Sequence, residues 1–154
     1  MISARASILV DSPCQRVYEF VAVNFQRNYR RWSPEVEHLE MLTPGPLRVG
    51  SRARQVRVDQ GRRSDNTFRV VALEPPRQVH FAESSDKFRV AYRIDPEGNR
   101  ARLTFGFELR RVELYMRPFE KLMRAAVQEG AERVVRNIKG LVERESMQPR
   151  KSLT

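Results

Sequence analysis

The sequence predicts an α+β protein in which one antiparallel sheet packs against a long C-terminal helix. Apolar residues recur at intervals of three and four from about 115 to 145, which is the period of one face of an α-helix. Upstream, short segments of alternating apolar and polar residues are separated by turn-forming residues, as in a sheet with one buried face. The helix spans roughly 40 Å, so its apolar stripe needs a broad partner such as this sheet.

The first elements are predicted to be one strand and two short helices. The strand covers residues 4–10, and the first helix follows it to about residue 23. We expect Ser12 to cap this helix and Gln15 to complete a capping box, because serine and glutamine stand at the required spacing. A shorter helix is expected over 24–32, before a proline that ends it.

Six further strands follow the helices, and turn-forming residues separate them. Alternation is clearest in the last hairpin, where the apolar residues of each strand share one face. The predicted strands cover residues 36–42, 50–58, 63–73, 78–83, 88–94 and 101–110. The apolar stripe of the closing helix consists of Phe119, Leu122, Met123, Ala126, Val127, Gly130, Val134, Ile138 and Leu141.

Chain length and composition indicate one domain. The 154 residues are enough for a core, and we assign residues 1–145 to the domain and expect 146–154 to be a basic, disordered tail. No apolar run approaches the roughly 20 residues that cross a bilayer, and the N-terminus lacks the apolar segment of a signal peptide. Cys14 is the single cysteine, so we expect a reducing, cytoplasmic setting.

The charge is strongly positive, with a net value of +10 and a pI of about 10.7. Such a charge attracts nucleic acid, anionic membranes or acidic ligands. The basic residues are scattered, however, as on an ordinary solvated surface. One hairpin concentrates Arg52, Arg54, Arg57, Arg62 and Arg63 but offers no aromatic residue for base stacking, which disfavours nucleic acid. Weak attraction to an anionic membrane remains an open alternative.

The sequence contains no motif for a metal, a cofactor or an activated nucleophile. His38 and His80 lie in separate predicted strands without further ligands at metal-binding spacing. Cys14 lies in the first turn of a helix with no histidine nearby in the sequence, so we interpret it as a structural thiol. We therefore expect no metal and no cofactor.

The order of elements resembles the helix-grip fold of the START-like (SRPBCC) superfamily, and most closely its polyketide cyclase/dehydrase-like, lipid-transport-type branch. The resemblance spans nearly the whole chain. It rests on the closing helix after Pro118 and on the segments ILVDSPCQRVYEFV, NYRRWSPEVEHLEML, VGSRARQV and VVALEPPRQVHF. It implies a curved seven-stranded sheet wrapped around the long helix, with a cavity between them for an apolar or aromatic ligand.

Candidate residues for this cavity lie on the second helix, on the inward face of the strands and on the closing helix. Gly130 stands within the apolar stripe, where glycine is unfavourable and indicates either close helix–sheet contact or vacant space. Packing without a cavity is an equally good explanation of these residues. The pocket candidates are Tyr29, Trp32, Phe68, Phe81, Val90, Tyr92, Phe105, Phe107, Met123, Val127 and Gly130.

Two functions follow from the resemblance. The leading one is binding, and in some cases carriage, of a hydrophobic lipid-like or aromatic small molecule by a monomer or homodimer. The alternative is a cofactor-free polyketide cyclase or dehydratase. For the enzyme, the candidate catalytic residues are Tyr92, whose hydroxyl lies on an apolar face, and Arg54, which shares alternation with Val56 and is expected to point inward.

Overall fold

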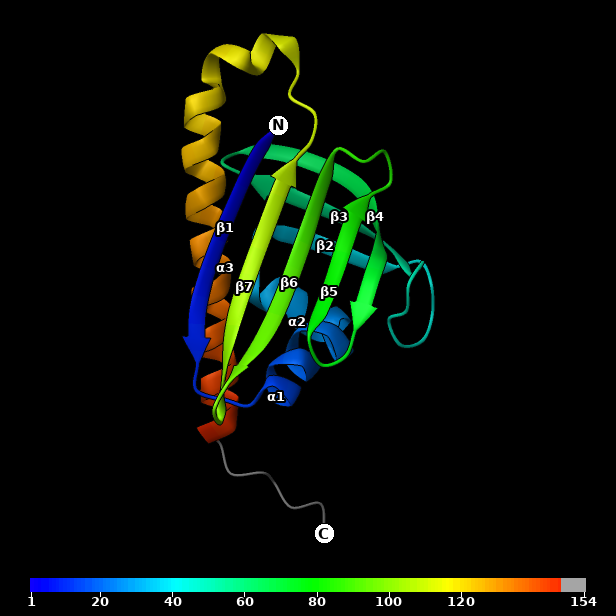
Figure 1. Cartoon of the computed structure of the whole chain (residues 1–154). Coiled ribbons are helices and arrows are strands. Elements are labelled where there is room, and N and C mark those ends of the chain that lie inside the picture. Colours follow the sequence, from blue (N-terminus) through cyan, green and yellow to red (C-terminus); the bar gives the residue numbers. More distant parts are fainter. Residues whose placement is uncertain (148–154) are drawn as a thin grey trace.

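The computed structural model describes residues 1–147 and shows a curved, seven-stranded antiparallel sheet with a long helix along one edge (Figure 1). The strands lie in the order β1-β7-β6-β5-β4-β3-β2, which confirms the predicted α+β class and the number of strands. The strand bounds are β1 Ile2–Val10, β2 Val36–Met41, β3 Arg52–Asp59, β4 Arg62–Glu74, β5 Gln78–Glu83, β6 Phe88–Glu97 and β7 Arg100–Leu109.

The connection from β1 to β2 is helical but more broken than predicted. It consists of α1 Cys14–Tyr18, the π-helix η1 Glu19–Val23 and α2 Phe25–Trp32. The Asn24 N–H donates to the Glu19 carbonyl at 2.9 Å, five residues back, which widens the last turn. This wider turn ends the first helix and lets α2 leave in a new direction.

The predicted capping box is wrong. Pro13 occupies the position before α1, and its carbonyl accepts the N–H groups of Arg16 and Val17. The Ser12 hydroxyl is buried and has no hydrogen-bond partner within residues 1–147. The Gln15 amide instead donates to the Glu19 carboxylate at 3.0 Å. The helix therefore starts one position too late for Ser12 to reach its free N–H groups.

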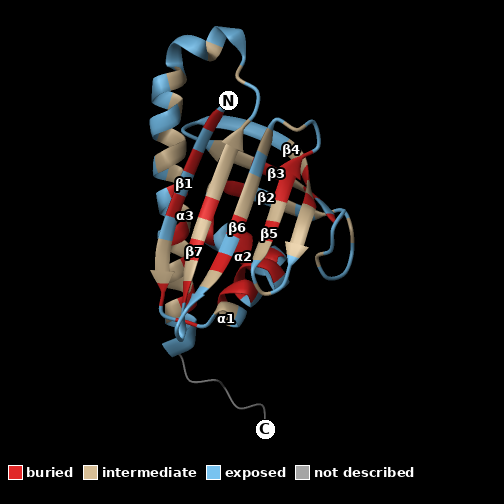
Figure 2. Ribbon diagram, in the orientation of Figure 1, coloured by how far each residue is buried: buried red, intermediate tan, exposed pale blue. Residues whose placement is uncertain are grey.

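The closing helix has two parts, the 3₁₀ segment η2 Leu114–Phe119 and the helix α3 Glu120–Met147. The expectation that its apolar stripe is buried along the whole length is wrong. Phe119 and Leu122 are 51% and 69% exposed, whereas Ala131, Val135, Ile138 and Val142 are buried. Figure 2 shows this change from exposed to buried residues along α3. Only the C-terminal half of α3 is therefore enclosed.

Polar contacts hold α3 against the edge strand β1 and against α2. The Gln128 amide donates to the Arg5 carbonyl at 3.0 Å, and Lys139 Nζ donates to the Leu9 carbonyl at 2.8 Å. Asn137 donates to the Trp32 carbonyl at 3.0 Å. The bonds to the Arg5 and Leu9 carbonyls satisfy backbone groups that an uncovered edge strand exposes. Helix α3 ends at Met147, two residues beyond the expected domain boundary, and the rest of the expected tail lies outside the described residues.

The first prediction concerns this uneven burial of α3. Replacing Ile138, which is fully buried, with alanine is expected to lower the free energy of unfolding by about 2–5 kcal/mol, because it removes core contacts and leaves a cavity. Leu122→Ala, on the same helix, is expected to change it by less than about 0.5 kcal/mol. Urea denaturation followed by circular dichroism measures both, and equal losses would contradict the structure.

Candidate functional site

The interior of the curved sheet holds a cluster of aromatic rings contributed mainly by α2, β4, β5, β6 and β7. Phe25 lies at its centre, with ring centroids 4.8 Å from Tyr29 and 4.9 Å from Phe81. Tyr92 lies 5.8 Å from Trp32 and 5.1 Å from Phe105. These distances are those of direct aromatic packing, so the cluster fills the part of the concave face nearest α2.

Polar side chains enter this aromatic cluster from β3. The Tyr29 hydroxyl donates to Gln55 Oε1 at 2.7 Å and accepts from Arg57 Nη1 at 3.0 Å. The Trp32 indole N–H donates to the Tyr92 hydroxyl at 3.2 Å. The other side of the Arg57 guanidinium bonds to Asp59. This network therefore places the Arg57 guanidinium and the phenols of Tyr29 and Tyr92 within or beside the aromatic cluster.

The electrostatics of this network keep the phenols neutral and the guanidinium charged. Burial raises the pKa of Tyr29, an effect that the nearby Arg57 charge partly opposes. Burial also raises the pKa of Tyr92, and proximity to Tyr29 adds to the increase. Burial works to lower the pKa of Arg57, but Tyr29, Asp59 and Glu35 outweigh it, so this pKa is raised.

This arrangement can stabilise negative charge more readily than it can remove a proton. A neutral phenol and a guanidinium are hydrogen-bond donors, and neither is a base at neutral pH. Tyr92 accepts one bond, and within residues 1–147 its own O–H has no acceptor. An oxygen atom that reaches this buried hydroxyl would therefore find a proton that is not already shared with a protein acceptor.

The predicted pocket residues are either buried or half-buried. Six aromatic residues are buried together in the cluster: Tyr29, Trp32, Phe68, Phe81, Tyr92 and Phe105. Val90, Phe107 and Val127 are partly buried and pack against that core. Met123 and Gly130 are half-buried on α3. A Cβ on Gly130 would meet only Arg133, at 3.9 Å, so this glycine does not serve close helix–sheet contact.

Arg54 does not point inward, and the expected alternation of β3 is wrong. Its guanidinium forms two hydrogen bonds to Asp65, at 2.9 and 2.6 Å, on the exposed side of the sheet. The inward positions of β3 are Ala53, Gln55 and Arg57. The sequence predicted that Val56 and Val58 face inward together with Arg54, because apolar residues of a strand usually lie on its buried face. Sequence reasoning therefore missed Gln55 and Arg57.

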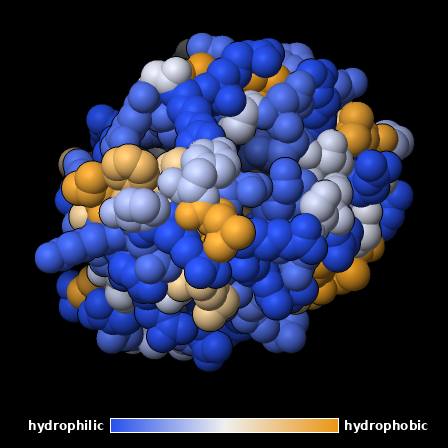
Figure 3. Space-filling model, turned by 90° about the horizontal axis from the view of Figure 1, so that it is seen from above, coloured by the Kyte–Doolittle hydropathy of each residue, from blue (hydrophilic) through white to orange (hydrophobic). Residues whose placement is uncertain are grey.

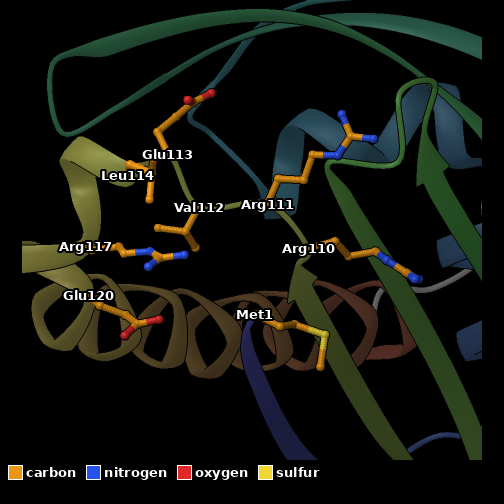
Figure 4. Close-up of a pocket in the computed structure, with 8 residues that line it drawn as sticks. All are labelled: Met1, Arg110, Arg111, Val112, Glu113, Leu114, Arg117 and Glu120. Atoms are coloured by element: carbon orange, nitrogen blue, oxygen red, sulfur yellow. The ribbon is translucent and has the colours of Figure 1, made fainter.

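A pocket of about 660 Å³, drawn in Figure 4, opens at the end of the molecule that lies farthest from α1 in Figure 1. It lies between the start of β1, the linker from β7 to η2 and the first turn of α3. Val112, Arg117 and Glu120 extend into the space between linker and helix, and Arg110 and Arg111 extend away from it. The complete lining is Met1, Arg110, Arg111, Val112, Glu113, Leu114, Arg117 and Glu120.

The described part of the chain offers neither a cluster of metal ligands nor a membrane-spanning helix. Across residues 1–147, no three side chains of the metal-binding types gather closely enough to hold an ion. Over the same range, the structure has no helix long and apolar enough to span a membrane.

Fold and interior together define a START-like protein of the helix-grip type. Residues 1–143 match the family described as polyketide cyclase / dehydrase and lipid transport, and the chain belongs to this family. No curated protein matches the sequence significantly.

Solved structures of low sequence identity share the fold. The protein TTHA0849 from Thermus thermophilus is 20% identical with a TM-score of 0.74, over 94% of this chain and 99% of that one. The ZhuI aromatase/cyclase from a Streptomyces species is 17% identical with a TM-score of 0.73, over 94% of each chain. A START superfamily protein from Mycobacterium smegmatis is 16% identical with a TM-score of 0.69, over 93% and 98%.

The second prediction uses the raised tyrosine pKa values. Above pH 10, the ordinary value, the unfolded chain releases phenolic protons that buried Tyr29 and Tyr92 retain, so stability falls as pH rises. Below pH 10, the folded and the unfolded protein both keep these protons, so the two tyrosines cause no change of stability with pH. In the Tyr92→Phe variant, the free energy of unfolding is expected to fall less steeply with pH, by about 1.4 kcal/mol per pH unit. Urea denaturation in alkaline buffers measures this slope.

The control for this experiment is Trp32→Phe. It removes the same indole–phenol hydrogen bond but keeps the buried Tyr92 phenol, so the alkaline slope is expected to stay at its wild-type value. A wild-type slope in the Tyr92→Phe variant would show that this phenol is not buried in the folded protein.

Proposed function

We propose that this protein binds a hydrophobic small molecule between β6 and β7 of the sheet and the N-terminal half of α3. One observation carries the proposal: apolar side chains on both walls of this region are only partly covered. Val90 and Phe107 line the sheet side, and Val127 lies on α3. Exposed apolar area of this kind is stabilised by an apolar ligand. The pocket at the η2 end of α3 is the route of entry that we propose for this ligand.

The sheet wall of this region becomes more buried along β6. Phe88 and Val90 are half-buried, and Phe88 stacks on Phe107 with centroids 6.0 Å apart. The next residue on the same face, Tyr92, is 2% exposed, and Ile94 is fully buried. Tyr92 thus stands where the partly open wall meets the closed cluster, and its hydroxyl lies against Trp32 of α2. This position favours a ligand with an apolar body and an oxygen at its inner end.

Catalysis is the second candidate, because Arg57 provides a permanent positive charge inside the protein. A guanidinium with neighbouring phenols stabilises an enolate oxygen, which forms when a polyketide-like chain cyclises or loses water. The structural similarity to an aromatase/cyclase supports the same reading. The catalytic role is then to hold the reacting chain and its developing charge, with Tyr92 as the donor and Arg57 as the fixed positive charge.

The third prediction tests the binding site with neighbouring residues of α3. Met123 is half-buried one turn before Val127, whereas Leu122 is 69% exposed on another face of the helix. Met123→Trp fills the proposed site and is expected to weaken binding of a neutral apolar dye about tenfold, a loss of about 1.4 kcal/mol. Leu122→Trp adds the same side chain outside the site and is expected to leave binding unchanged.

Fluorescence titration of the dye measures both variants, and native mass spectrometry of the purified wild type detects a retained ligand. If both tryptophan variants bind the dye as the wild type does, the site is elsewhere. If the wild type binds no apolar dye and retains no ligand, the proposal fails.

The fourth prediction separates a carrier from an enzyme by two arginines of β3. Arg57 points inward to Tyr29, and Arg54 points outward to Asp65. If the protein is a cyclase, Arg57→Gln is expected to lower turnover of a polyketide-like thioester by about 100-fold or more while the ligand still binds. Arg54→Gln is expected to keep full turnover. Unchanged turnover in Arg57→Gln contradicts the catalytic role, and thermal unfolding verifies that each variant is folded.

A further inference from the structure

Exposed apolar side chains gather where the chain passes from η2 into α3. Leu114, Tyr115, Phe119 and Leu122 are 73%, 65%, 51% and 69% exposed. Isolated exposed apolar residues are common, but four of them fall within residues 114–122, which leaves much apolar area in water on one short segment. We call these four side chains the apolar tip. So much exposed apolar area on the apolar tip indicates that an apolar partner covers it.

Basic residues surround the apolar tip. Residues 110–124 contain five basic and two acidic side chains, which gives this segment a net charge of +3. Arg110 pairs with Asp86, and Arg124 lies 3.6 Å from Glu120. For Arg111, Arg117 and Lys121, the described part of the chain provides no acidic partner. The partner that covers the tip therefore carries negative charge beside its apolar part.

The arrangement of the elements suits a flat partner at the end of the molecule. In Figure 1, η2 crosses this end, and α3 runs away from it along the side of the sheet. Figure 3 looks onto the same end and shows hydrophobic residues exposed among hydrophilic ones. The pocket opens here too, since Leu114 and Arg117 belong to its lining. A surface that contacts the tip therefore also faces the pocket.

We infer that the apolar tip docks on the surface of an anionic lipid bilayer, with the pocket turned toward the lipids. The apolar side chains enter the boundary between headgroups and acyl chains, and the cations stay among the anionic headgroups. A second copy of this chain fits less well, because two segments of charge +3 repel each other. Nucleic acid would satisfy the cations and leave the apolar side chains in water.

Docking is a property separate from the proposed ligand binding, and it is tested on ligand-free protein. The assay is co-sedimentation with phosphatidylcholine vesicles that contain or lack phosphatidylglycerol. The wild type is expected to bind only the anionic vesicles. Arg111→Gln/Arg117→Gln/Lys121→Gln is expected to weaken binding about 100-fold, or about fivefold for each charge removed. Tyr115→Ser/Leu122→Ser removes half of the apolar tip, keeps every charge and is also expected to bind more weakly.

The control is Arg77→Gln/Arg100→Gln/Arg144→Gln, which removes the same charge from the opposite end of the molecule. These residues lie between β4 and β5, at the start of β7 and in the last turn of α3, and each is exposed. This variant is expected to bind anionic vesicles about as well as the wild type.

Four outcomes would overturn the inference. One is the absence of wild-type binding to anionic vesicles at low salt. Another is an equal loss in the control variant, or no loss in Tyr115→Ser/Leu122→Ser, since both results indicate attraction by net charge alone. The last is a dimer in sedimentation equilibrium that dissociates in Tyr115→Ser/Leu122→Ser, because the tip would then be an interface between copies.

Discussion

Phe25 and Trp32 of α2 pack into the concave face of the sheet, and this aromatic contact determines how the rest of the interior is used. Their rings meet those of Phe81 and Tyr92 at ordinary packing distances, so the part of the sheet beside α2 has no free surface. Helix α3 closes over this part only, where Ile138 and its neighbours are buried. Toward η2, no second helix within residues 1–147 covers the sheet, and apolar side chains of both walls remain partly exposed. The division into a closed and an open half thus follows from the position of α2.

The closed half carries a charge that an aromatic core does not need for stability. A buried guanidinium is costly unless its hydrogen bonds are satisfied. Arg57 meets this condition through Tyr29 and Asp59, and its side chain is still 24% exposed. Glu83 is a buried carboxylate of this face, but it accepts the N–H groups of Ser85 and Lys87 and so supports the β5–β6 turn. The groups directed into the interior are consequently donors, which limits the chemistry to binding an oxygen or stabilising its charge.

The sequence predicted most of the fold because its alternation and helical periods are regular, and it located six aromatic residues that do lie together. It did not predict β3, where the inward residues are small or polar. Ala53 faces inward beside the large Phe68, its partner on β4. Gln55 and Arg57 also face inward, where their side chains bond to the Tyr29 hydroxyl. These contacts depend on neighbours distant in the sequence. The exposed stripe of α3 was missed for a similar reason: periodicity shows which side of a helix is apolar, but not how far the covering surface extends.

The structure also changes how the net charge of +10 is interpreted. Of the five arginines concentrated in the β3–β4 hairpin, Arg54 is paired with Asp65, and Arg57 is turned toward Tyr29 and Asp59. Similar pairs on the outer face of the sheet join Arg93 to Asp95 and Arg102 to Glu97. Neutralised arginines attract phosphates weakly, so this hairpin is a poorer nucleic-acid surface than its sequence suggests. Residues 110–124 differ because cations that lack an acidic partner in the described chain adjoin apolar side chains there, and only a partner that is both anionic and apolar satisfies the two together.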